Sequence, residues 1–357
     1  MTFLLAVSTG DPAGVGPAVS VAAALREASP TGPAVALVGD AGALERLARA
    51  RGGAVRRVSL ETVSGLSPGE IGVVHACEWD AAVEKAHAPT AEGGTAQLLA
   101  LETAARLVLD GTAHALVTAP ISKRAVELSG VPFRGHTEHL ARMAGLADAD
   151  VSMLFLGLRL RVGLVTTHVR VRDAGGELST VAVERTIRHL SQAIARVDAG
   201  TEPLRIAVTG LNPHAGEGGK FGPEDDGVIA PGIEAARRAL AAVASPARRA
   251  EILGPIPAET AFRWAREGQV HGVVAMLHDQ ATIASKLLDW GDAVNVTWGL
   301  PFVRTSVDHG VAYDAARAGT ADASGMIAAL RLATRLAPGP TRSGERRGAG
   351  ERGRTGP

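Results

Sequence analysis

The stretch FLLAVSTGDPAGVGP, residues 3–17, decides the fold class. It begins with an apolar run, Phe3–Val7, short enough for one buried strand, and continues into a loop with three glycines and two prolines. In α/β proteins such a loop follows a strand at the ligand-binding edge of the sheet. The glycines are spaced neither as a P-loop nor as the G-x-G-x-x-G of a Rossmann domain, so the loop either approaches a phosphate or forms a structural turn.

Similar apolar runs recur along the chain and predict further buried strands. They are Ala34–Val38, Ile71–Val74, Ala115–Val117, Met153–Leu156, Val162–Val165, Arg205–Val208, Gly272–Met276 and Ala293–Val296. Helical patterns lie between them at Gln97–Leu109, Val183–Val197, Ile233–Ala242 and Ala323–Leu336. This alternation predicts an α/β fold with a largely parallel sheet. Weak boundaries near 120–135 and 300–320 suggest that a middle segment forms its own lobe.

The composition excludes several classes of protein. The 357 residues include 37 Lys+Arg and 37 Asp+Glu, so the formal net charge is zero, which disfavours a strongly basic nucleic-acid-binding protein. No apolar stretch is long enough for a membrane span, and the single cysteine, Cys77, is expected to be a small buried side chain. We therefore expect a cytoplasmic protein without nucleic-acid or membrane partners. Residues 341–357, with five Arg, five Gly and two Glu, are expected to be a disordered tail.

Three histidines lie in the segments that follow predicted strands: His168, His214 and His278. Because the carboxyl ends of parallel strands meet at one edge of a sheet, we expect these side chains to lie at a common rim. Neutral imidazoles bind Zn²⁺ and similar ions, and three of them leave coordination positions open. Their spacing matches no local zinc motif, so three ordinary packed histidines are the alternative.

Two further polar groups stand out. Lys286, Asn295 and Arg304 combine a point charge, an amide and a guanidinium fork, which suits a phosphate or carboxylate, although ordinary solvated charge is the alternative. Lys occurs only four times and Asn twice in the chain, so Lys286 and Asn295 are expected at positions that need these residue types. The segment Gly135–His139 either contributes histidines to a metal site or begins a helix with Thr137 as its cap.

Together these segments resemble the 4-hydroxythreonine-4-phosphate dehydrogenase family of vitamin B6 biosynthesis. The resemblance covers about residues 4–336 and rests on Gly10–Pro17, Thr118–Lys123, Gly135–Glu138, Thr166–His168, Gly210–Gly219, Gly254–Phe262, His278–Gln280 and Ala293–Gly310. It implies a fold like that of isocitrate and isopropylmalate dehydrogenases, with two α/β lobes around a central cleft and no Rossmann domain. Both lobes would lie within residues 1–340, the middle lobe at roughly 130–300.

The resemblance also implies site residues and partners. It implies a homodimer with one divalent ion (Zn, Mg or Co) per site, bound by His168, His214 and His278, where His278 comes from the neighbouring subunit. The implied substrate contacts are His136, Thr137, Lys286, Asn295 and Arg304. NAD or NADP is expected along the loops around Asn295–His309. Lys286, His136 or a metal-bound water is the expected general base, and Asp279 and Asp308 are expected to orient His278 and His309.

The implied reaction oxidises 4-hydroxythreonine 4-phosphate to 2-amino-3-oxo-4-phosphooxybutanoate, which decarboxylates to 3-amino-2-oxopropyl phosphate. The chain departs from the family pattern at Ala18, Ser122, Val169–Asp173, Glu259 and Ala281–Ala284. These departures leave open a sister dehydrogenase of a four-carbon sugar-acid phosphate, erythronate or threonate 4-phosphate. A metal-dependent hydrolase and a catalytically inactive metabolite-binding protein are the more distant alternatives.

Overall fold

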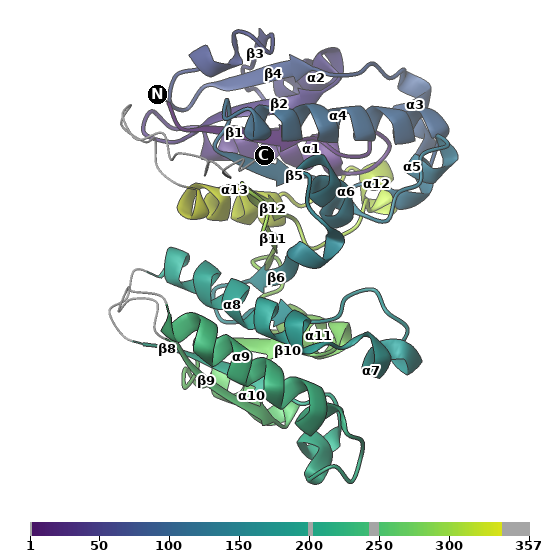
Figure 1. Ribbon diagram of the computed structural model, residues 1–357. Coiled ribbons are helices and arrows are strands. Elements are labelled where there is room, and N and C mark those ends of the chain that lie inside the picture. The colour runs from purple at the N-terminus through teal and green to yellow at the C-terminus, as the bar shows by residue number, and fades with distance from the viewer. Residues whose placement is uncertain (1, 199–202, 243–249, 338–357) are drawn as a thin grey trace, which may run out of the picture.

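The structure, a computed structural model, describes residues 2–198, 203–242 and 250–337, and shows two α/β lobes (Figure 1). The strands are β1 (Leu4–Ser8), β2 (Ala34–Gly39), β3 (Arg56–Val58), β4 (Ile71–His75), β5 (Ala115–Thr118), β6 (Ser152–Leu156), β7 (Arg161–Leu164), β8 (Leu204–Thr209), β9 (Ala250–Ile256), β10 (Gly272–Ala275), β11 (Val294–Trp298) and β12 (Val303–Ser306). The α-helices are α1 (Gly16–Glu27), α2 (Ala41–Ala50), α3 (Ala81–Ala86), α4 (Ala91–Leu109), α5 (Lys123–Leu128), α6 (His136–Met143), α7 (Ala174–Glu177), α8 (Thr180–Val197), α9 (Ala230–Ala241), α10 (Ala258–Arg266), α11 (His278–Leu288), α12 (Tyr313–Ala318) and α13 (Ser324–Leu336). The tail predicted at 341–357 lies outside the described residues.

All described strands form one sheet, in the order β3-β4-β2-β1-β5-β12-β11-β6-β7-β10-β8-β9. The first six of these run parallel to one another, and so do the last four. Between them β11 and β6 pair antiparallel with both neighbours, so the strand direction is reversed from one lobe to the other. The predicted α/β fold with two lobes and no Rossmann arrangement is confirmed.

The predicted strands are all present, but the parallel prediction holds only within each lobe. Three described strands were not predicted, namely β3, β9 and β12, because polar or irregular residues interrupt their apolar pattern. Helix α4 begins six residues before its predicted start, since Thr90 caps it by accepting a hydrogen bond from the amide of Gly93 (3.0 Å).

Helices cover both faces of the first lobe's sheet, which explains the continuous apolar run of β1. Leu5 and Val7 pack into a core with residues of α1 and α13, whereas Leu4 and Ala6 pack on the other face with residues of α4. Strands buried on both faces need apolar residues at every position. Gly10, directly after β1, has φ +74° and leaves no room for a side chain, because a Cβ there would lie 2.2 Å from the carbonyl oxygen of Pro120. The glycine-rich loop is therefore closely packed at this position.

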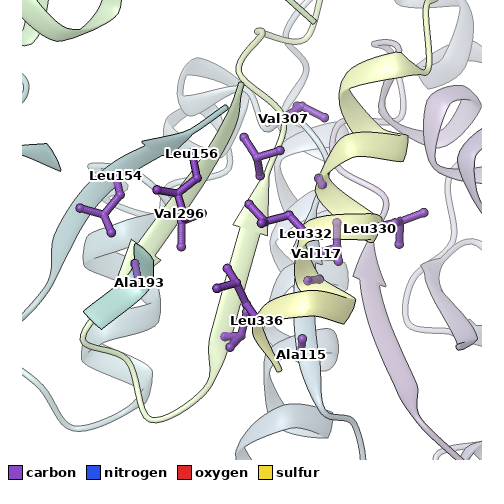
Figure 2. Close-up of a cluster of buried hydrophobic side chains, with 14 of the residues drawn as sticks. Ala115, Val117, Leu154, Leu156, Ala193, Val296, Val307, Leu330, Leu332 and Leu336 are labelled. Atoms are coloured by element: carbon purple, nitrogen blue, oxygen red, sulfur yellow. The ribbon is translucent and has the colours of Figure 1, made fainter. Parts of the chain in front are cut away.

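One hydrophobic cluster continues from the first lobe into the second (Figure 2). Helix α13 contributes Leu330 and Leu336, and the linking strands contribute Leu154 of β6 and Val296 of β11, all fully or almost fully buried. Because successive side chains of a strand point to opposite faces, Asn295 of β11 lies on the face away from this core. Strand β11 is thus packed firmly on one face and presents Asn295 on the other.

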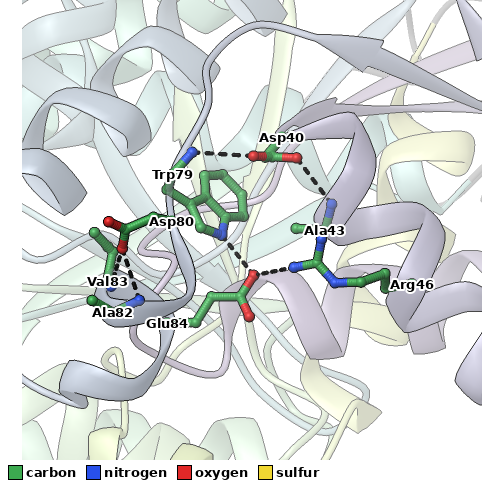
Figure 3. Close-up of polar contacts among 8 residues, drawn as sticks. All are labelled: Asp40, Ala43, Arg46, Trp79, Asp80, Ala82, Val83 and Glu84. Atoms are coloured by element: carbon green, nitrogen blue, oxygen red, sulfur yellow. Dashed lines mark hydrogen bonds and ion pairs between the residues drawn. The ribbon is translucent and has the colours of Figure 1, made fainter.

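A polar network holds the loops around α2 and α3 of the first lobe (Figure 3). Asp40 accepts hydrogen bonds from the amide of Ala43 at the start of α2 (2.9 Å) and from the amide of Trp79 (3.1 Å). Glu84 accepts bonds from the indole of Trp79 (2.9 Å) and from Arg46 (2.7 Å). This network joins two helices that are distant in sequence.

The described residues bear on two further expectations from the sequence, the burial of Cys77 and the character of the helices. Cys77 is buried, and burial raises the pKa of its thiol to about 12, as expected for a small buried side chain. Within residues 2–198, 203–242 and 250–337, each helix is too short or too polar to cross a bilayer.

His189 makes the fold sensitive to acid. Its Nδ1 lies 3.0 Å from Ser152 Oγ, and burial, with Arg188 and Arg185 nearby, lowers its pKa to about 3. The unfolded chain binds this proton near pH 6.5, so the free energy of unfolding should fall by about 1 kcal/mol per pH unit as the pH drops from 6.5 toward 3. Urea unfolding of wild type and His189→Gln across this range tests the expectation. The variant should lose less stability in acid, and identical pH profiles would contradict the assignment.

Candidate active site

A cavity of about 320 Å³ lies between the lobes and contains most of the predicted site residues. Its lining includes His136, Thr137, His168, Lys286, Asn295, Arg304, Asp308 and His309. His214, His278 and Asp279 do not line it. The volume suits a small metabolite, and the polar groups converge from both lobes and from the linking strands.

Arg304 of β12 is the most unusual residue of this cavity. It is only 2% exposed, and its guanidinium donates to Thr118 Oγ1 (2.6 and 3.1 Å) and Thr297 Oγ1 (3.0 Å). Among the described residues no carboxylate lies within ion-pair distance of it. Burial lowers the pKa of Arg304 to about 9, although the charge of Glu138 opposes this shift. The cavity therefore contains a desolvated positive charge held only by hydroxyls, which attracts an anion.

The start of α6 faces the same cavity. The structure shows that Gly135, not Thr137, takes the cap position, and no side chain caps the helix. A Cβ at Gly135 would lie 2.9 Å from Glu138 Oε2, so a larger residue there would require the Glu138 side chain to shift. Thr137 instead lies in the first turn, with its Oγ1 3.3 Å from Thr297 Oγ1. Amides without a side-chain cap at a helix start favour an anion, which adds to the effect of Arg304.

Asn295 and Lys286 also reach the cavity. The side-chain Oδ1 of Asn295 is buried and has no hydrogen-bond partner in the described chain. An unpaired buried polar atom is costly, so a ligand that pairs with this amide would bind more tightly. Lys286 Nζ lies 3.6 Å from Asp308 Oδ2, and burial raises the pKa of Asp308 while Lys286 lowers it. Asp308 thus contacts Lys286, whereas the Nδ1 of His309 lies 2.9 Å from the Gly310 carbonyl oxygen.

His136 is an uncharged ring in this setting. Burial, followed by the positive charges of Arg304, His139 and Lys123, holds the pKa of His136 well below its ordinary value. Lys123 and Glu138 line the cavity as well, and the sequence analysis assigned neither a role. Lys123 begins α5 just after the loop that follows β5 and is one of only four lysines, a signal that could have identified it.

Two of the three candidate metal ligands lie together within one chain. The ring centroids of His168 and His278 are 5.7 Å apart, and Asp279 Oδ1 lies 2.8 Å from His278 Nδ1. A carboxylate on Nδ1 is a common partner of metal-binding histidines and leaves Nε2 as the nitrogen that would bind the ion. Burial, with Lys123 and His278 nearby, lowers the pKa of His168, so its ring is neutral as metal binding requires. These donors suit a divalent ion such as Zn²⁺.

His214 is not part of this pair. It lies in the loop after β8 with left-handed backbone angles, φ 56° and ψ 29°, and its ring is near Phe221, with 6.5 Å between centroids. Asn212 Nδ2 donates to Glu224 Oε2 (2.8 Å) and Asp225 Oδ2 (2.9 Å), which holds the loop in place. In the described part of a single chain, no three His, Cys, Asp or Glu side chains come close enough to bind a metal ion.

A second cavity of about 450 Å³ adjoins the first. The two share Lys286, Asp308, His309 and Gly310, and the second extends over α12 and the start of α13. The lining of this second cavity is more apolar, with Val15, Trp290 and several alanines. A larger ligand placed here would reach a molecule in the first cavity at the shared residues.

Comparisons with known proteins agree with this architecture. The sequence model of a family described as pyridoxal phosphate biosynthetic protein PdxA matches residues 32–333. A 4-hydroxythreonine-4-phosphate dehydrogenase of Geobacter metallireducens is 41% identical, covering 93% of this chain and 95% of that protein. A D-threonate 4-phosphate dehydrogenase of Salmonella typhimurium is 37% identical, covering 94% and 99%. The crystal structure of a 4-hydroxythreonine-4-phosphate dehydrogenase from Klebsiella pneumoniae has a TM-score of 0.77 and 35% identity, covering 94% and 98%.

Proposed function

Because the chain belongs to the pyridoxal phosphate biosynthetic protein PdxA family and is a dehydrogenase, we propose that it oxidises 4-hydroxythreonine 4-phosphate with NAD or NADP. The product, 2-amino-3-oxo-4-phosphooxybutanoate, then loses CO₂ to give 3-amino-2-oxopropyl phosphate. D-threonate 4-phosphate is the second candidate substrate, because a relative with that name is nearly as similar to this chain as those named for 4-hydroxythreonine 4-phosphate.

The observation that carries this proposal is the buried, uncompensated charge of Arg304. A phosphate on the substrate would supply the missing negative charge in a desolvated place, where such pairing is strong. The uncapped start of α6 and Nδ2 of Asn295 would donate further hydrogen bonds to the phosphate, whereas the unpaired Oδ1 of Asn295 would accept one from a donor group of the substrate. Binding energy from the phosphate would position the alcohol for reaction.

A residue of the chain itself would then accept the proton of the substrate alcohol. Lys286 lies where the two cavities meet, so it is the first candidate for the general base, and the neutral ring of His136 is the second. Asp308 would hold the Lys286 side chain in place through the 3.6 Å contact, and Lys286 would accept the alcohol proton as a neutral amine. Thr118 and Thr297 would keep Arg304 oriented through their hydroxyls, and Thr137 contacts the hydroxyl of Thr297.

The proposed reaction needs a divalent ion and a nicotinamide cofactor, and the chain has residues suited to each. His168 and His278, with His214, would hold a divalent ion (Zn, Mg or Co), which would lower the pKa of the substrate alcohol as a Lewis acid. The second cavity would hold NAD or NADP, whose nicotinamide accepts the hydride. Because this cavity shares Lys286 and His309 with the first, a cofactor there would lie beside the substrate.

We also propose a homodimer, in which His278 crosses to the partner's site. Helix α11, which begins at His278, has an exposed apolar stripe of Ile283 (60% exposed), Leu287 (80%) and Trp290 (81%) with the segment that follows it. A stripe of this kind is commonly covered by another protein surface. A second copy packed on α11 would bring its own histidines close to this helix start.

The decisive experiment follows absorbance at 340 nm with each nicotinamide, a series of divalent ions, and three substrates. We expect turnover of 4-hydroxythreonine 4-phosphate, and a value of kcat/KM about a thousandfold lower for 4-hydroxythreonine without its phosphate. Turnover of D-threonate 4-phosphate alone would make the second candidate the correct one. Product formation without nicotinamide reduction would indicate a metal-dependent hydrolase and refute the proposal.

A further inference from the structure

A third cavity, of about 560 Å³, lies on the opposite face of the linking strands from the active site. Val294 of β11 lines this cavity, whereas the next residue, Asn295, lines the active site. Adjacent residues of a strand point to opposite faces, so the two cavities are separated by the thickness of the sheet. The turn between β6 and β7, the end of α1 and one side of α13 complete the lining of the third cavity.

The side chains that line this cavity are mostly basic. Four arginines line it, Arg26, Arg161, Arg331 and Arg335, against a single acidic residue, Asp292. The whole chain has equal numbers of basic and acidic residues, so its average composition does not explain this clustering. We call these four side chains the arginine cluster.

Half of the arginine cluster is already paired and half is not. Arg161 forms an ion pair with Asp198 (2.7 Å) and Arg331 with Glu27 (2.9 Å). Arg335 donates to the carbonyl oxygen of Val197 (3.3 Å), and across the described ranges neither Arg335 nor Arg26 has a carboxylate within 4.0 Å. Two guanidinium groups therefore retain their capacity for an anion.

We propose that the arginine cluster is a second anion site, which takes a small molecule with more than one phosphate group. Guanidinium forks bind phosphate oxygens in pairs, and a cavity of about 560 Å³ lined by four arginines has room for a ligand with several charged groups. Arg26 and Arg335 belong to helices of the first lobe, whereas Arg161 begins β7 of the second. The bound anion would bridge the lobes directly behind Asn295 of the active site.

The test is isothermal titration of the full-length protein with pyrophosphate. The double variant Arg26→Gln/Arg335→Gln removes the two guanidinium groups without a carboxylate partner, so it leaves no acidic group unpaired. The control, Arg49→Gln/Arg238→Gln, removes two exposed arginines outside the cavity and changes the net charge equally. We expect the first variant to lose one binding event per chain, or to bind it at least about tenfold more weakly, while the control binds like wild type.

Binding at the active site is a separate event, since it depends on Arg304 and persists in both double variants. A thermal midpoint of Arg26→Gln/Arg335→Gln close to that of wild type verifies that this variant folds. If it titrates like wild type, or if the control loses binding to the same extent, the arginine cluster is not an anion site. Failure of the proposed dehydrogenase reaction would leave this result unaffected.

Discussion

Replacing Arg304 with methionine is expected to lower kcat/KM for the phosphorylated substrate by about a thousandfold, because a desolvated charge pair is worth several kcal/mol. The side chain has no carboxylate within ion-pair distance in the described chain, so its positive charge remains available for the substrate phosphate. Steady-state kinetics by nicotinamide absorbance measures the change. The loss should appear mainly with substrates that contain a phosphate.

The controls separate phosphate binding from folding. Methionine removes a buried charge and keeps much of the side-chain volume, so the thermal midpoint of Arg304→Met should not fall below that of wild type. Arg304→Lys keeps a charge but loses the fork, and should retain more activity than methionine. If Arg304→Met impairs the dephosphorylated substrate as much as the phosphorylated one, Arg304 does not bind the phosphate.

Arg304 also illustrates where sequence reasoning failed. Its strand, β12, was not predicted, because Arg304, Thr305 and Ser306 have the polar pattern of a loop although all three are buried. The apolar strands were found because strands covered on both faces must be apolar throughout. Strand β12, which lies beside the linking strand β11 and carries a binding group, departs from that rule.

The histidine rim was predictable in part. His168 and His278 follow β7 and β10, which are neighbours in the sheet, so the rule that parallel strands end at one edge brought them together. His214 follows β8, the next strand, but its loop conformation depends on bonds from Asn212 to Glu224 and Asp225. Such side-chain contacts have no periodicity in the sequence, so the place of His214 could not be predicted.

The other large effect is expected at these histidines. His168→Ala and His278→Ala should each lower kcat/KM by about a thousandfold or more, because a divalent ion that polarises the alcohol contributes several kcal/mol to the transition state. The purified variants should also retain less divalent metal by elemental analysis, a readout that is independent of activity. An unchanged metal content in both would exclude them as ligands.

Coexpression of the two inactive variants tests where the ligands come from. If His278 crosses the dimer interface, a heterodimer of His168→Ala and His278→Ala has both substitutions in one site and none in the other. In a random mixture about half of the dimers are of this kind, and each has one intact site of its two. Activity should therefore return to about a quarter of the wild-type value. His168→Ala with His214→Ala is the matched control, since both of these ligands would belong to the same subunit and no intact site can form.

No recovery in either mixture would mean that each site belongs to one chain, as the 5.7 Å between the His168 and His278 ring centroids would then explain. Recovery in the control mixture would instead place His214 in the partner's site.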